Sequence, residues 1–270
     1  MGADLGTRNG MSTATYLYCL ARCGREPSLA KAPPGLPGCS PPRAVPVDEG
    51  LWLVVADAPL PGYAGETIQE RLSDLSWVSD CALAHEAVIE HFADAEAVLP
   101  MKLFTLFSSD ERALAHVRGS RERLDRVLDR VAGRVEWGVR VHLDEARARA
   151  VMAEEARAGD GRQGAGTSFL LRKKVEKDAA RELAGRLREE MDKAFDELAA
   201  AASEAVRREP AASPEAGGRL LLDAAFLVPA GSAGEFESVV ERCASRLAPR
   251  ACDLTLTGPW PPYHFIEETR

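Results

Sequence analysis

The chain opens with two apolar runs that are separated by a proline-rich segment. Residues 15–20 and 51–56 are rich in Leu, Val, Tyr and Trp and are bounded by turn-forming residues, a pattern typical of buried strands. Most of residues 24–50 can neither donate to a strand ladder nor continue a helix, because prolines recur throughout the segment. We expect residues 24–50 to form an exposed loop.

A strand and two helices are expected next. Apolar side chains recur every three or four positions between residues 78 and 92, which predicts a helix with one face packed on a sheet. Residues 98–107 are mostly apolar and predict a strand. Ser108 and Glu111 then form an S-x-x-E capping box, so we expect a helix from Ser108 to Val131.

The second half of the chain mixes both periodicities. Residues 135–143 alternate apolar and polar, which predicts a strand with one solvent-facing side. Helical spacing over residues 169–206 predicts one long amphipathic helix, and the continuous apolar run 219–228 predicts a strand buried on both faces. A helix capped by Ser232 and a strand over residues 254–257 complete the pattern.

Strands and helices therefore alternate in both halves of the chain, which indicates an α+β protein. A length of 270 residues corresponds to about two domains of ~150 residues. We place the boundary near Ala132, with an N-terminal α+β domain over residues 1–131. The second domain, residues 132–270, carries the long helix and a proline-rich tail.

Composition and charge narrow the functional classes. The net charge is 34 − 42 = −8, so the chain as a whole does not attract a phosphate backbone, and no nucleic-acid partner is expected. No stretch approaches the ~18 apolar residues of a membrane span, and the first residues lack the apolar core of a signal peptide. We expect a cytoplasmic protein without a membrane partner. In a reducing compartment its six cysteines are expected to be free thiols.

Three motifs resemble known chemical sites but lack the required context. Residues 159–164 read G-x-G-x-x-G, yet a helix-like segment precedes them instead of the strand that a phosphate loop needs. His85 and Glu86 begin an H-E-x-x-H zinc motif, but Ile89 replaces the second histidine. Cys19 and Cys23 have no second ligand pair at zinc spacing. We predict no catalytic residue, no metal and no cofactor.

Two single residues leave alternatives open. His85 falls on the apolar stripe of its helix, where a core histidine that is satisfied by a backbone carbonyl is the favoured interpretation. Lys102 interrupts the apolar run 98–107, and a lone buried cation there would cost several kcal/mol. Lys102 therefore either pairs with a carboxylate or contacts a domain or partner surface.

Three strings, in order, carry a resemblance to a known family. The first is Ala84-His85-Glu86 followed by Leu99-Pro100-Met101-Lys102 and Thr105, the second is Glu136-Trp137-Gly138-Val139-Arg140-Val141, and the third is Leu256-Thr257-Gly258-Pro259-Trp260-Pro261-Pro262-Tyr263-His264-Phe265. Together they resemble the gas vesicle protein F/L family over nearly the whole chain. The candidate interaction or structural-motif residues are His85, Pro100, Lys102, Thr105, Trp137, Trp260, Pro261, Pro262 and Tyr263.

One stretch departs from the family pattern. Members usually carry Arg-Phe-Gly-Thr where this chain has Lys102-Leu103-Phe104-Thr105. The departure removes a forked guanidinium donor and a glycine, so a role in bidentate recognition at Lys102 is in doubt.

The resemblance implies a fold and a function. It implies an N-terminal modified ferredoxin-like α/β sandwich and a C-terminal α+β domain with a long amphipathic helix. It also implies a non-enzymatic minor component or assembly factor of the gas vesicle, which binds the main shell protein, gas vesicle protein A, supports nucleation, and contacts other accessory proteins. Trp260 and Tyr263, on a stiff proline-rich segment, suit either an interface or a strap packed over the chain itself.

The rival hypothesis is an enzyme or small-ligand sensor built on the same scaffold, because ferredoxin-like folds host many functions. A deep pocket lined by convergent polar groups around His85 or Lys102 would favour that hypothesis.

Overall fold

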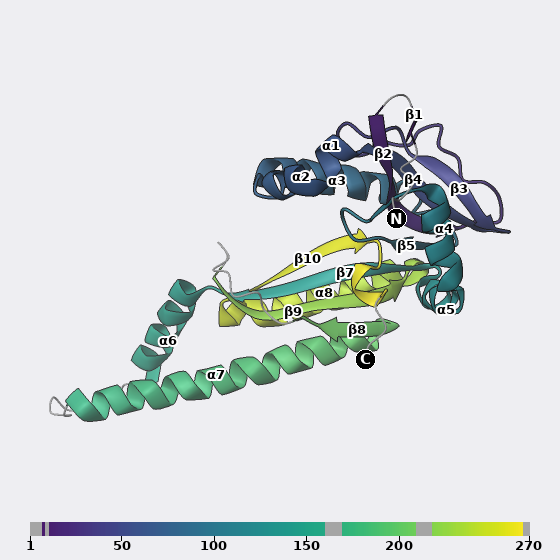
Figure 1. The fold of residues 1–270 in the computed structure, drawn as a ribbon. Helices are drawn as coiled ribbons and strands as arrows, with labels where there is room; N and C mark the ends of the chain where they lie inside the picture. Colours follow the sequence, from purple (N-terminus) through teal and green to yellow (C-terminus); the bar gives the residue numbers. More distant parts are fainter. Residues whose placement is uncertain (1–6, 9–10, 160–168, 209–217, 267–270) are drawn as a thin grey trace. The chain divides into compact units, whose positions relative to one another are not determined.

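The computed structural model describes residues 7–8, 11–159, 169–208 and 218–266, and it divides the chain into two compact units (Figure 1). Unit 1 comprises Met1–Val135 together with Trp260–Arg270, and unit 2 comprises Glu136–Pro259. The division lies close to the boundary expected near Ala132. It differs from that expectation in the tail, because the residues from Trp260 onward belong to unit 1.

Unit 1 is built on an antiparallel sheet. Its strands are β1 (Thr7–Arg8), β2 (Met11–Arg22), β3 (Arg43–Asp48), β4 (Leu51–Pro59), β5 (Ala97–Pro100) and β6 (Leu106–Phe107). Both β5 and β6 pair with one edge of β2, while β4 pairs with its other edge and β3 lies beyond β4. Counted as β2, β3, β4 and β5, the strands lie side by side in the order 4-1-3-2, which is the ferredoxin-like arrangement.

The segment before β3 explains why the ferredoxin-like fold of unit 1 is a modified one. It connects β2 to β3, where the common fold has its first helix. The expectation of an exposed loop over residues 24–50 is wrong. Residues 43–48 form β3, and the part before β3 packs back on the core. Leu36 is buried and its N–H donates to Tyr18 Oη (3.0 Å), while Tyr63 Oη donates to the carbonyl of Pro37 (2.7 Å).

Helices cover the sheet of unit 1. They are α1 (Leu60–Tyr63), α2 (Gly65–Arg71), α3 (Leu75–Glu90), α4 (Asp110–Gly119) and α5 (Arg121–Val131). The single helix expected from Ser108 is in fact α4 and α5, which are separated at Ser120. Its cap is also one residue later than expected, since Ser109 accepts from the N–H of Arg112 (3.3 Å).

Unit 2 has the same strand order with a different first connection. Its elements are β7 (Arg134–Leu143), α6 (Glu145–Gly159), α7 (Phe169–Ala200), β8 (Glu204–Arg207), β9 (Arg219–Pro229), α8 (Ala233–Leu247) and β10 (Cys252–Trp260). The sheet order β10-β7-β9-β8 is again 4-1-3-2. The second unit, expected only as a general α+β domain, is therefore also ferredoxin-like. The glycine motif of residues 159–164 falls almost wholly outside the described residues.

The long helix expected over residues 169–206 is confirmed over most of its length. In its C-terminal half, Leu187, Met191, Ala194 and Leu198 are buried at steps of three and four residues. It ends six residues early, because Glu204–Arg207 forms β8 and pairs with the edge of β9. Backbone pairing to an edge strand therefore overrides the helical spacing at Val206.

Candidate partner-binding site

A tight turn interrupts the apolar run at residues 98–107, which was expected to be one strand. Between β5 and β6, both the N–H and the Oγ1 of Thr105 donate to the carbonyl of Lys102 (3.1 and 2.7 Å). The turn is held on β2, because the N–H of Met101 donates to the Tyr18 carbonyl (2.8 Å) and the N–H of Leu17 donates to the Thr105 carbonyl (3.0 Å). Thr105 is thus a turn-closing residue, and Lys102 stands exposed on the turn.

The buried side chain of His85 holds this turn through a hydrogen bond to its backbone. Its Nε2 lies 3.0 Å from the Met101 carbonyl, which can only accept, so Nε2 carries the proton and Nδ1 accepts from Tyr16 Oη (2.8 Å). Tyr16 Oη in turn accepts from the N–H of Phe104 (3.2 Å). Burial lowers the pKa of His85 to about 4, so the ring is neutral. The prediction of a core histidine that is satisfied by a backbone carbonyl is confirmed.

The backbone at Phe104 adopts a conformation that favours glycine, the residue that the resemblance leads us to expect there. Phe104 has φ +65°, a left-handed conformation that costs a residue with a Cβ about 1–2 kcal/mol. This chain carries phenylalanine there, and its ring stacks on Trp77 with ring centroids 5.4 Å apart and an interplanar angle of 3°. The stacking offsets part of the backbone cost.

The turn forms one wall of a cavity of about 300 Å³ within unit 1. Its floor is apolar and comes from β2 and β5, where Leu17, Leu20 and Leu99 are buried. Val117 and Leu124 add apolar side chains from α4 and α5. The sheet and the two helices therefore enclose a hollow that suits apolar side chains more than a polar metabolite.

The rim of the cavity is cationic. Lys102 and Arg123 line it and are exposed, with the ring of His116 beside them, and no carboxylate is among the described residues that line it. His116 lies against Phe107 with ring centroids 5.4 Å apart. The sequence analysis missed His116 and Arg123. The only signal for them is their place beside the apolar stripe of an amphipathic helix, which rarely distinguishes a binding rim from a solvated face.

The tail completes unit 1. Tyr263 Oη donates to Glu86 Oε2 (2.5 Å), and burial together with this carboxylate raises the pKa of Tyr263, so the hydroxyl keeps its proton. Pro262 and Phe265 are buried, and Arg130 Nη1 donates to the carbonyl of Phe265 (3.1 Å). The described part of the tail is a strap over unit 1, and it includes a short 3₁₀ turn, so its path is not purely extended.

The structure places the nine candidate residues in different settings. Pro100 is buried in β5, and Trp260 is 39% exposed beside half-buried Pro261. Of the nine, Pro100, Lys102 and Thr105 line the cavity. His85 bonds the carbonyl of Met101, which lines the cavity, and Tyr263 bonds Glu86 of α3.

The ninth candidate, Trp137, lies apart in the core of unit 2, where it packs against Phe236 at a centroid distance of 6.3 Å. Its neighbour Gly138 faces β10, because a Cβ there would lie 2.6 Å from Thr257 Oγ1. The second and third family strings therefore meet across the β7–β10 ladder. Packing inside unit 2 explains Trp137, Gly138 and Thr257, whereas the part of the third string from Trp260 onward belongs to unit 1.

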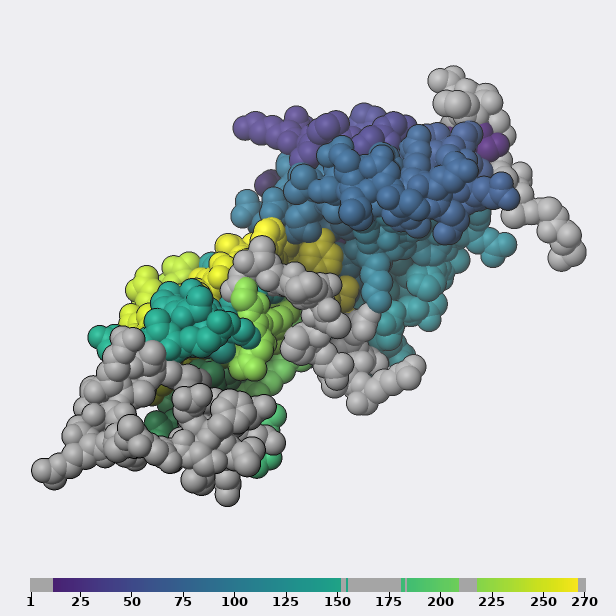
Figure 2. Space-filling view, turned by 90° about the vertical axis from the view of Figure 1, so that its left-hand side faces the viewer, coloured from purple at the N-terminus to yellow at the C-terminus, as the bar shows by residue number. Residues whose placement is uncertain are grey.

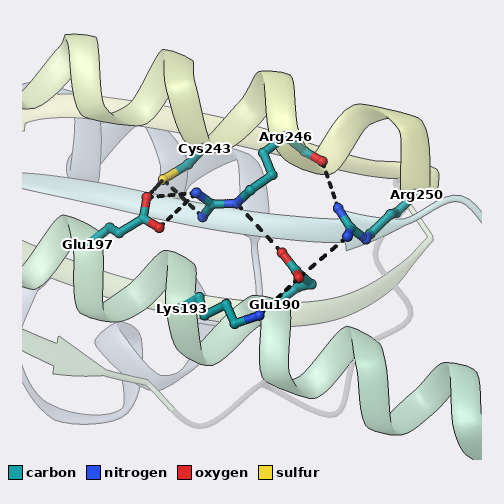
Figure 3. Close-up of polar contacts among 6 residues, drawn as sticks. All are labelled: Glu190, Lys193, Glu197, Cys243, Arg246 and Arg250. Atoms are coloured by element: carbon teal, nitrogen blue, oxygen red, sulfur yellow. Dashed lines mark hydrogen bonds and ion pairs between the residues drawn. The ribbon is translucent and has the colours of Figure 1, made fainter.

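An ion-pair network joins α7 to α8 in unit 2 (Figure 3). Arg246 Nη1 contacts both carboxylate oxygens of Glu197 (2.7 and 2.8 Å), and this guanidinium lowers the pKa of Glu197. The nearly buried carboxylate of Glu190 receives three cations, namely Lys193 at 3.4 Å, Arg250 at 3.5 Å and Arg246 at 3.6 Å. The network fastens two helices together, and every charge drawn has an opposite partner.

The thiol in that network is buried and favours its protonated form. Cys243 Sγ lies 3.5 Å from Glu197 Oε2, and burial raises the pKa of the thiol above its ordinary value. A wider hollow of about 530 Å³, between the C-terminal end of α7 and the start of α8, is lined mainly by Ala and Ser side chains. None of the family strings reaches it.

The described part of the chain has neither a metal-binding cluster nor a membrane-spanning helix. No group of three or more His, Cys, Asp or Glu side chains there could hold a metal ion. Nor does that part include a helix both long and apolar enough to cross a membrane.

Fold and site together define a two-unit α+β protein with a ferredoxin-like strand order in each unit and an apolar, cation-rimmed cavity in unit 1. The family model described as "Gas vesicle synthesis protein GvpL/GvpF" matches residues 14–267, and the chain belongs to this family of gas vesicle proteins.

Relatives and solved structures agree with that assignment. The chain is 30% identical to gas vesicle protein L of Streptomyces sp. (strain CB03234) over 259 residues, which cover 93% of this chain and 91% of that protein. It is 29% identical to gas vesicle protein F of the same organism over 260 residues, covering 94% and 100%. The similarity does not distinguish the F type from the L type.

The fold is also similar to that of two crystal structures. The GvpF structure from Anabaena sp. PCC7120 has a TM-score of 0.70 at 19% identity and covers 96% of this chain and 100% of that chain. The GvpF structure from Microcystis aeruginosa has a TM-score of 0.66 at 15% identity and covers 94% and 99%.

Proposed function

We propose that this protein is a non-enzymatic accessory protein, located in the cytoplasm and at the gas vesicle, that binds the main shell protein, gas vesicle protein A, and supports nucleation of the vesicle. Membership in the gas vesicle family supports the setting. A physical need supports the role, because shell subunits with large apolar patches would associate with one another unproductively unless those patches were covered.

The observation that carries the proposal is the cavity of unit 1. Pro100 and Thr105, which fit the family pattern, line it together with Lys102, its walls are apolar, and its rim is cationic. This arrangement suits an apolar side chain of a partner with a carboxylate beside it. The walls exclude water from the apolar group, and the rim cations attract the carboxylate. Such a site binds a protein segment and performs no covalent step.

The experiment is co-expression of the chain with the main shell protein, followed by co-purification. Reversing the rim charges in the Lys102→Glu/Arg123→Glu variant should lower the yield of complex about tenfold, because like charges then face the partner's carboxylate. Lys31→Glu is the matched control, since Lys31 is an exposed lysine of unit 1 that does not line the cavity. The control should keep the full yield.

Deletion of the chain provides the cellular readout. Vesicle yield should fall, and the rim variant should not restore it. Normal vesicles without the chain, together with no detectable complex, would overturn the proposal.

A further inference from the structure

Helix α3 exposes leucines on its outer face. Leu75 is 82% exposed and Leu83 is 68% exposed, and Leu72, just before the helix, is 40% exposed. Figure 2 shows the outer surface of this part of unit 1 as blue atoms that face the viewer. The opposite face of the helix is anchored in the core, where Cys81 and Val88 are buried.

These exposed residues share one side of the helix. Successive residues turn by about 100°, so Leu75, Ser79, Ala82 and Leu83 fall within an arc of about 100°. We call this set, with Glu90 at its C-terminal end, the α3 stripe. Its two leucines, Leu75 and Leu83, lie about 12 Å apart along the axis at 1.5 Å per residue. Beyond them, Glu86 falls in the same arc, is half-buried and accepts from Tyr263 Oη, so the tail of unit 1 contacts the helix between Leu83 and Glu90. About two turns of a second helix could lie along the leucines.

The surroundings of the stripe are acidic. Residues 65–90 contain six acidic side chains and one arginine. Glu90 is exposed at the last position of α3, where the helix dipole disfavours a carboxylate. Its placement therefore does not stabilise the isolated helix, and a cation from a partner would compensate it.

We propose that the α3 stripe binds an amphipathic helix of another protein whose apolar face is flanked by Lys or Arg. The leucines would contact the partner's apolar face, and Glu90 and Asp80 would attract its cations. An anionic lipid surface is disfavoured, because the acidic surroundings of the stripe would be repelled from it. A second copy of this chain would bring two acidic surfaces together. The stripe lies outside the set of residues that line the cavity, so this inference goes beyond the proposed shell-protein site.

The test uses the full chain and a fluorescent synthetic peptide of about 20 residues, with a leucine face and lysine flanks, in an anisotropy titration. The Leu75→Ser/Leu83→Ser variant should weaken binding at least about tenfold, and Glu90→Lys should weaken it several-fold. Val206→Ser is the matched control, because it removes an exposed apolar side chain from unit 2 and should leave the affinity unchanged. Because all three positions are exposed, the variants should fold like the wild type.

Several results would overturn the inference. Equal binding of the wild type and both stripe variants is one, and equal binding of a peptide with glutamate flanks is another. Light scattering that shows a dimer lost in Leu75→Ser/Leu83→Ser would assign the stripe to self-association, and stripe-dependent binding to vesicles of anionic lipid would assign it to a membrane. Lys102→Glu/Arg123→Glu should keep full affinity for the peptide, so failure of the shell-protein proposal and failure of this one are distinguishable.

Discussion

The neutral ring of His85 makes the stability of unit 1 depend on pH. The folded chain holds its pKa at about 4, against an ordinary value of 6.5. As the pH falls from 7 to 5 the unfolded chain binds a proton that the folded chain does not, so the free energy of unfolding should fall by about 2 kcal/mol. Below pH 4 both states are protonated and this loss stops.

Urea denaturation at several pH values between 7 and 5 measures the effect. His85→Gln should be less stable at pH 7 but should show a flatter dependence on pH, whereas His264→Gln, at an exposed position, should keep the wild-type slope. An unchanged slope in His85→Gln would contradict the assignment of the neutral, Nε2-protonated ring.

Phe104 offers a direct test of backbone strain. Because its φ is +65°, a glycine should fit the turn better than an alanine, although neither keeps the stack on Trp77. We expect Phe104→Gly to be more stable than Phe104→Ala by about 1 kcal/mol in thermal or urea unfolding. Equal stability of the two variants would show that the turn relaxes away from the left-handed conformation.

The sequence predicted that His85 is buried and bonded to a backbone carbonyl, but not which carbonyl, nor the bond to Tyr16. An apolar stripe identifies a buried position, whereas the bonds to Tyr16 and Met101 depend on how β2, α3 and the turn come together. The significance of Phe104 was similarly visible only as a departure from the family's glycine. Its positive φ is a property of the folded turn.

Among the elements, the β7–β10 ladder requires a glycine at position 138, where β10 leaves no room for a side chain. Gly138→Ala would place a Cβ 2.6 Å from Thr257 Oγ1, so we expect it to lower the free energy of unfolding by about 1–3 kcal/mol. The cost should shrink in a Thr257→Ala background, where the clashing atom is gone. It should persist in Thr257→Val, which keeps a branched side chain. Equal costs in both backgrounds, measured by urea denaturation, would contradict the close approach.

The spacing of apolar residues predicted the helices and strands that bury one face. It failed for strands that form only because they pair with a strand distant in the sequence. The strand expected over residues 51–56 is confirmed as the first six residues of β4, and the helix expected over residues 78–92 is confirmed as α3. In contrast, β3 carries a proline and has little alternation, and it forms because β4 offers an edge. The same reason explains β8, where a helical pattern at Val206 gives way to pairing with β9.

At the scale of the whole molecule, the chain repeats one strand order twice. Each unit has the 4-1-3-2 sheet, but unit 1 replaces its first helix with a docked proline-rich segment, and unit 2 fills the same connection with α6 and α7. The sequence indicated two α+β domains but could not assign the tail. The tail's place depends on contacts such as Tyr263 to Glu86, which are 177 residues apart.

The central claim is that the cavity of unit 1 binds the shell protein, and photocrosslinking in cells that make both proteins tests it most directly. A photoreactive residue is placed at Lys102 or Arg123 on the rim, or at Lys31 as the matched exposed position away from it. We predict covalent adducts with the shell protein from Lys102 and Arg123 and little or none from Lys31. Adducts that are equally strong at all three positions, or strong only at Lys31, would contradict the claim.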